Sequence, residues 1–311
     1  MSGPICDPDE SPSPTLDEPE TCEVQIVPAV EASVGAVSVN RLVPRRSRRM
    51  VGAWCFVDHM LPAQLSEDVG LDVGPHPHIG LQTVTWLIEG TVLHRDSLGS
   101  EQLIRPGQLN LMAAGDGVSH SEETRGIYSG PLEGIQFWVA QPESTRHGSA
   151  AFEHHENLPQ VDVGNASATV LVGSFGGASS PARNDSQVVG VQLAHRAGST
   201  VLPLEPGFEY AVVVVNGGVR VCGSEVSSGE LGYLGIGRDE VGIDADGEAL
   251  VMLIGGEPFV DELVMWWNYV ARSRDEITRA HRDWSTGSER FGVVHSSLER
   301  VDVADPPWIR G

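Results

Sequence analysis

The sequence contains no lysine, and all 20 of its basic residues are arginine. This absence excludes a phosphate-loop lysine, a Schiff-base lysine and every mechanism that uses a lysine as general base. Any chemistry carried out by this chain must therefore come from histidine, carboxylates, hydroxyl groups or a bound metal.

Cysteine is scarce, and its spacing is irregular. The four cysteines form neither a Cys-x-x-Cys motif nor any other close pair: Cys6, Cys22, Cys55 and Cys222. This spacing argues against a thiolate metal site and against a disulfide framework. A reducing, cytoplasmic compartment is the resulting expectation.

Long apolar runs and positive charge are also missing. No run of about 18 apolar residues occurs, so we expect no membrane span. The formal net charge of -23 argues against direct nucleic-acid binding, which depends on neutralising phosphates with basic side chains. Residues 1–23 hold seven acidic residues and no basic one, the reverse of a signal peptide, and we interpret them as a disordered acidic tail.

One segment runs against the acidic composition. The stretch RLVPRRSRRM, residues 41–50, contains five arginines. We favour a solvated loop that balances the acidic body over the alternative, an anion-binding or partner-binding site.

From about residue 24 the chain consists of short β-branched runs separated by glycine and proline turns. Residues 83–97 are typical of a strand, a turn at Glu89 and Gly90, and a second strand. A second series of such runs begins near residue 168, after the polar stretch 153–167. This rhythm predicts two consecutive β-barrels.

The pattern changes near the C-terminus, where a helix is expected. Ser273 and Glu276 have the spacing of a capping box, and four residues share one helical face: Ile277, Ala280, His281 and Trp284. On that face we interpret His281 as a packed residue and not as a ligand. The predicted domains are a tail (1–23), a first barrel (24–160), a second barrel (161–265), and a helix with its tail (266–311).

Two pairs of candidate metal ligands stand out in the first barrel. His76 and His78 flank Pro77, and His120 and Glu122 repeat the same spacing. Successive residues of a strand point to opposite faces, so each pair projects to one side. One His-x-His motif is weak evidence, but a His-x-His and a His-x-Glu pair in one barrel together predict a mononuclear metal site. Imidazole and carboxylate ligands suit iron, manganese, nickel, cobalt or copper more than a structural zinc.

Two other histidines have less defined roles. For His94 we weigh a place on the strand surface against a supporting contact to a metal ligand. His195 is the one histidine of the second barrel region, which argues for a structural role and a barrel without metal.

Residues 76–123, HPHIGLQTVTWLIEG through AAGDGVSHSEE, closely resemble the N-terminal cupin domain of the pirin family. The resemblance extends through residues 48–62, 134–142 and 256–292. It implies an all-β fold of two cupin barrels (double-stranded β-helices, or jelly rolls) with a short C-terminal helix. It also implies one metal, usually iron, held in the first barrel by His76, His78, His120 and Glu122. Relatives commonly have Glu where this chain has Gln82, a change that bears on pocket polarity and on contacts to the metal ligands more than on metal binding itself.

The resemblance implies two functions of different classes. In the first, a quercetin 2,3-dioxygenase opens a flavonol with molecular oxygen, and Glu122 serves as ligand and as catalytic base. In the second, the metal state regulates binding to a protein partner without catalysis, and the arginine-rich segment is the candidate surface. An unrelated small substrate is a third reading. For an enzyme, we expect an apolar pocket over the metal, built from Trp54, Phe56, Met112 and Phe137.

Overall fold

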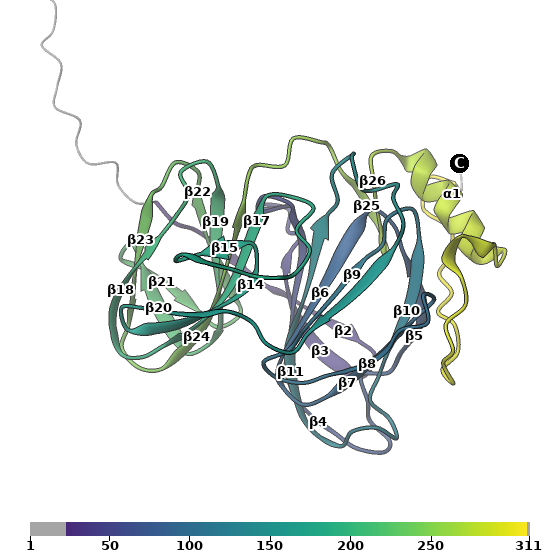
Figure 1. Ribbon diagram of the computed structural model, residues 1–311, viewed down its shortest axis with the longest axis horizontal. Coiled ribbons are helices and arrows are strands. Elements are labelled where there is room, and N and C mark those ends of the chain that lie inside the picture. The colour runs from purple at the N-terminus through teal and green to yellow at the C-terminus, as the bar shows by residue number, and fades with distance from the viewer. Residues whose placement is uncertain (1–22, 310–311) are drawn as a thin grey trace, which may run out of the picture.

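The computed structural model describes residues 23–309 and shows two β-barrels side by side (Figure 1). One α-helix lies among the described residues, next to the first barrel. The expected all-β fold of two barrels with a short C-terminal helix is confirmed. The predicted acidic tail, apart from Glu23, lies outside the described residues.

The first barrel consists of two antiparallel sheets. Their strand orders are β12-β9-β6-β11-β4-β3-β2 and β5-β10-β7-β8. The strands of the larger sheet are β2 Val30–Val34, β3 Val37–Val43, β4 Trp54–Leu65, β6 Leu81–Glu89, β9 Leu109–Ala113, β11 Gly130–Ala140 and β12 Ala151–His155. Those of the smaller sheet are β5 Val73–His78, β7 Val92–Asp96, β8 Glu101–Ile104 and β10 Val118–Glu123.

The second barrel repeats this design, with sheet orders β1-β22-β19-β24-β17-β14-β13 and β18-β23-β20-β21. The larger sheet contains β1 Gln25–Pro28, β13 Gln160–Val163, β14 Ala166–Val172, β17 Val188–His195, β19 Glu209–Asn216, β22 Glu230–Gly235 and β24 Ala249–Gly256. The smaller sheet contains β18 Gly198–Pro203, β20 Gly218–Val221, β21 Ser224–Ser227 and β23 Glu240–Ala245. A small ribbon, β15 Ser174–Phe175 with β16 Ala178–Ser179, lies beside it.

The first strand of the chain joins the second barrel. β1 pairs with β22, and its Val27 is buried in the core between the barrels. The first domain was expected to span residues 24–160, whereas hydrogen bonding puts Gln25–Pro28 in a sheet of the second barrel. A four-residue strand carries no signal of its partner, because any free sheet edge offers the same backbone groups.

The two large sheets share one hydrophobic core. It combines first-barrel side chains such as Trp54, Trp86 and Phe137 with second-barrel side chains such as Val213 and Met252. The indole N–H of Trp54 donates to the Gly255 carbonyl at 2.9 Å, which ties the barrels together through a buried hydrogen bond. A separate cluster of mostly aliphatic residues fills the interior of the second barrel.

The C-terminal segment covers the first barrel. It runs from residue 264 to residue 309 and contains β25 Val264–Trp266, β26 Tyr269–Ala271, α1 Arg274–Ser285 and the 3-10 turn η1 Glu289–Phe291. Ser273 caps α1 by accepting from the Glu276 N–H, and the buried residues of the helix are the four predicted: Ile277, Ala280, His281 and Trp284. His281 packs edge-on against Trp266 and bonds Asp305, in keeping with its predicted packing role.

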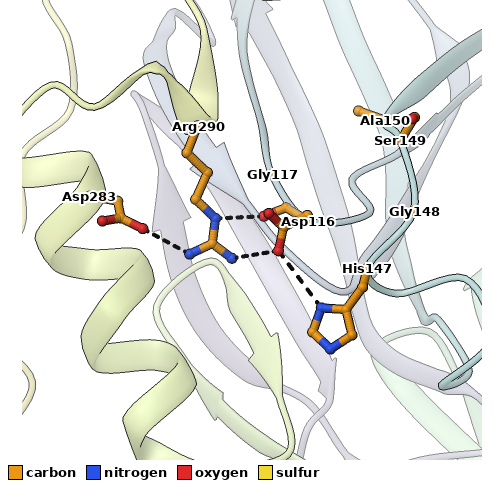
Figure 2. A pocket seen from close by; sticks show the side chains of 8 residues that line it. All are labelled: Asp116, Gly117, His147, Gly148, Ser149, Ala150, Asp283 and Arg290. Carbon is orange, nitrogen blue, oxygen red and sulfur yellow. Dashed lines mark hydrogen bonds and ion pairs between the residues drawn. The ribbon is translucent and has the colours of Figure 1, made fainter.

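Arg290 connects α1 to the first barrel (Figure 2). Its guanidinium donates to the Asp283 carboxylate on α1, and to the carbonyl and the carboxylate of Asp116, just before β10. A surface hollow of about 570 Å³ surrounds this group. The charged side chains around this hollow already pair with one another, so we do not interpret it as a ligand site. We interpret the Arg290 bonds as a clamp that holds the helix against the barrel.

The cysteines of the described residues differ in state. Cys55 is free and fully buried, and burial raises the pKa of its thiol to about 12. Cys222 is disulfide-bonded, which the sequence spacing did not predict. Within residues 23–309, no helix combines the length and hydrophobicity that crossing a membrane requires.

Candidate metal centre

Three histidines meet inside the first barrel. β5 and β10 pair antiparallel, with His76 directly opposite His120 and His78 opposite Val118. The three rings are buried, and one ligand nitrogen from each lies within 4.8 Å of the others. Strand alternation therefore directs both imidazoles of β5 and that of His120 to one point.

Backbone carbonyls orient the two histidines of β5, and one of these carbonyls belongs to the C-terminal segment. The Nδ1–H of His76 donates to the Gly74 carbonyl at 2.9 Å, and that of His78 donates to the Asn268 carbonyl at 3.1 Å. Gly80 has a φ of +67°, and a Cβ there would lie 2.2 Å from the Val270 carbonyl oxygen. Only glycine therefore fits where the backbone at residue 80 passes close to Val270. The two hydrogen bonds of His76 and His78 leave their Nε2 lone pairs directed at the point where the histidines meet.

His120 is oriented through His94. His94 Nε2 lies 3.1 Å from an Asp96 carboxylate oxygen, and its Nδ1 lies 3.3 Å from Nδ1 of His120. Burial alone would raise the pKa of Asp96, but hydrogen bonds from His94 and Ser100 hold it below its ordinary value. Because ionised Asp96 only accepts, His94 donates from Nε2 and accepts at Nδ1. His120 then donates from Nδ1 and presents the Nε2 lone pair. Of the two roles considered for His94, the structure supports the contact to a ligand.

The arrangement fits a metal ion. The Nε2 atoms of His78 and His120 are 3.0 Å apart, and the hydrogen bonds above leave a lone pair on each. A cation held by both nitrogens would remove this repulsion. Burial lowers the pKa of His76 to about 4, and burial with mutual repulsion lowers those of His78 and His120 well below the ordinary value. All three are therefore neutral, which is the form in which imidazole binds a metal.

Glu122 lies beside this group in the wall of the same pocket. A β-bulge between His120 and Glu122 shifts the register, so that Glu122 faces Val73 on β5 and His94 on β7. Burial raises the pKa of its carboxyl to about 7, and it has no hydrogen-bond partner among the described residues. The three-histidine group does not include Glu122, so its role as a ligand stays a prediction.

A pocket of about 470 Å³ opens over the histidines. One wall is aromatic: Phe56 and Trp138 stack with ring centroids 4.0 Å apart, and Trp138 meets His78 edge-on at 5.3 Å. The C-terminal segment closes another side with Trp267, Asn268 and Val301. The volume lies within the range of small-molecule sites, and the aromatic wall suits a flat ring.

The comparisons with known proteins agree with this architecture. The profile of the Pirin family matches residues 36–139, and that of the Pirin C-terminal cupin domain matches residues 189–292. The chain belongs to the pirin family. It is 38% identical over 262 residues to a pirin-like protein of Caulobacter vibrioides, covering 82% of this chain and 90% of that protein.

Two relatives of this pirin carry the name of an enzyme. A Pseudomonas aeruginosa protein, provisionally named quercetin 2,3-dioxygenase, is 46% identical over 303 residues, 95% of this chain and 94% of that protein. A crystal structure of quercetin 2,3-dioxygenase from Acinetobacter baumannii matches with a TM-score of 0.88 and 41% identity, covering 91% of this chain and 96% of that one. The Escherichia coli pirin in complex with nickel(II) shares the fold, with a TM-score of 0.60, 19% identity and coverage of 76% and 100%.

The apolar pocket residues predicted from the sequence are mostly wrong. Of the four, only Phe56 lines the metal pocket. Trp54 and Phe137 lie in the core between the barrels, and Met112 lies in a small buried cluster near Phe152. Alternation along β11 turns Trp138 into the pocket and Phe137 away, and a bulge opposite Trp138 shifts β4 between Trp54 and Phe56. Trp138 was missed, and strand alternation within GIQFWVAQP was its one available signal.

Gln82, the departure from the pirin pattern, does not line the metal pocket. It follows the alternation of Val84 and Trp86, which face the core between the barrels. Its side-chain amide nitrogen is buried without a hydrogen-bond partner. The change at Gln82 therefore lies on the face of β6 that is turned toward the barrel interface, and the expected effect on pocket polarity was wrong.

The arginine-rich segment divides into two parts. Arg46 and Arg49 are exposed, as expected of a solvated loop. Arg48 lies over the Tyr233 ring, 3.4 Å from its centroid, and bonds Gln25. Arg41 lies on β3 in the wall of the metal pocket, so the loop interpretation does not hold for it.

Proposed function

We propose that this pirin is a metal-dependent dioxygenase that acts on quercetin-type flavonols, with iron as its metal. The observation that carries the proposal is the buried group of His76, His78 and His120 opening onto a pocket with an aromatic wall. The names of the Pseudomonas and Acinetobacter relatives support the substrate class. Iron is the family's usual metal, whereas the E. coli neighbour was crystallised with nickel(II).

Each group in the site has a defined part in the proposed reaction. The three histidines, with Glu122 as the predicted fourth ligand, would hold the metal, which when bound supplies Lewis acidity and redox chemistry with molecular oxygen. Phe56 and Trp138 offer a flat surface against which the flavonol rings stack. The Glu122 carboxylate lies in the pocket wall, where it can accept the proton of the flavonol hydroxyl.

The test is an assay of iron-loaded protein with quercetin and oxygen, following the loss of flavonol absorbance and the release of carbon monoxide. We expect metal-dependent turnover and close to one iron per chain. The double variant His76→Ala, His120→Ala should lose both, because two of three imidazoles are removed. Glu122→Gln should keep most of the metal and lose about 10²- to 10⁴-fold in rate, the usual contribution of a general base.

His295→Ala is the matched control, since His295 is exposed and lies outside the pocket. It should keep both metal and activity. Equal metal content in the wild type and the double variant would remove the site. No turnover by protein with its full metal content would reject the dioxygenase and favour the partner-binding regulator.

A further inference from the structure

Arg41 and Asp58 form a paired group in the pocket wall, on adjacent strands. The Nε and Nη2 of Arg41 donate to the two carboxylate oxygens of Asp58 at 2.8 and 2.7 Å. Asp58 is 2% exposed, whereas the Arg41 side chain keeps 34% of its surface exposed. The carboxylate thus fixes the guanidinium in one orientation.

The guanidinium retains free donors after this pairing. Arginine carries five N–H groups, and the two bonds to Asp58 use one on Nε and one on Nη2. The Nη1 group has no hydrogen-bond partner among residues 23–309, and Arg41 lines the metal pocket. The site therefore offers fixed donors to an oxygen atom of a bound molecule.

The aromatic wall connects these donors with the metal centre. Arg41 lies 4.7 Å from the centroid of the Phe56 ring, Phe56 stacks on Trp138, and Trp138 contacts His78. All four side chains line the same pocket. A flat molecule along this wall would have the histidines at one end and the guanidinium at the other.

We propose that Arg41, held by Asp58, determines substrate specificity by binding an oxygen at the end of the substrate distant from the metal. The preferred substrates are then planar aromatic compounds with metal-binding oxygens at one end and a hydroxyl or oxyanion at the other. This inference deepens the proposed function and rests on it for the choice of flavonols as probes.

The test compares two flavonols with the iron-loaded protein. Quercetin and 3-hydroxyflavone share the oxygens that would face the metal, but 3-hydroxyflavone lacks all other hydroxyls. We expect wild-type protein to bind quercetin more tightly, measured anaerobically by quenching of tryptophan fluorescence. Arg41→Gln should lower the affinity for quercetin about tenfold, as loss of a hydrogen bond to a charged group does, and leave that for 3-hydroxyflavone little changed. In turnover, KM should rise more than kcat falls.

Two further variants separate binding from structure. Arg41→Gln leaves the Asp58 carboxylate buried without its partner, so the double variant Arg41→Gln, Asp58→Asn restores a neutral pair. It should show the same loss of preference for quercetin, with metal content unchanged. Arg49→Gln removes an exposed arginine of the same segment and should alter neither affinity.

The outcomes distinguish this inference from the proposed function. Quercetin binding that depends on Arg41 without any turnover would reject the dioxygenase and keep the role of Arg41. Turnover that is indifferent to Arg41 would reject the role of Arg41 alone. The role of Arg41 would also be overturned if Arg41→Gln lowered the affinity for both flavonols equally, if the wild type did not prefer quercetin, or if neither flavonol bound.

Discussion

At the scale of single residues, the metal centre depends on which nitrogen of each imidazole carries the proton. Backbone carbonyls settle this for His76 and His78, and the Asp96–His94 pair settles it for His120. The ring of His94 also stacks on Phe152, with centroids 4.4 Å apart. His94 would therefore act on a bound metal through His120, because it is not one of the three converging histidines.

His94→Phe tests this role, because it keeps the ring stacked on Phe152 and removes both ring nitrogens. We expect metal affinity to fall about 10- to 100-fold, the usual cost of losing such an orienting hydrogen bond. Competition with a chromophoric chelator measures it. His295→Phe serves as the control at an exposed position. Unchanged affinity in His94→Phe would show that His120 keeps its orientation without this contact.

At the scale of elements, the C-terminal segment is part of the metal pocket. It provides the carbonyl of Asn268 that accepts from His78, and Trp267 and Val301 line the cavity. The segment is held by the aromatic packing of α1 and by the Arg290 clamp (Figure 2). Loosening this segment should therefore weaken the metal site from a distance.

Arg290→Met tests the clamp. The change removes the hydrogen bonds to Asp116 and Asp283, and we expect α1 to lose about 1–3 kcal/mol of protection against opening. Hydrogen exchange of the helix amides measures it. Arg279→Met is the matched control, because Arg279 is an exposed residue of the same helix. Equal exchange in the two variants would mean that packing alone holds the helix in place.

At the scale of the whole molecule, the two barrels share one core, so we expect them to unfold together. Trp54 lies in that core, 1% exposed, and bonds the other barrel through Gly255. Trp54→Ala should lower the free energy of unfolding by about 3–5 kcal/mol, as is usual for a buried aromatic residue. Calorimetry should show one transition in the wild type. Two separate transitions would contradict the view of a single cooperative unit.

The sequence by itself determined the features that depend on local geometry. The period of two along a strand directed His76, His78 and His120 to one side, and the capping box of Ser273 and Glu276 placed the helix. These patterns follow from backbone geometry within a few residues, so they can be inferred without knowing which strands pair.

Only the tertiary structure decided the features that depend on distant partners. Asn268 orients His78 from 190 residues away, β1 joins the second barrel, and a bulge opposite Trp138 separates Phe56 from Trp54. The pairing of Arg41 with Asp58 likewise follows from the register of β3 against β4. A strand's own sequence does not specify its neighbour, its register or its bulges, because these depend on how the whole core packs.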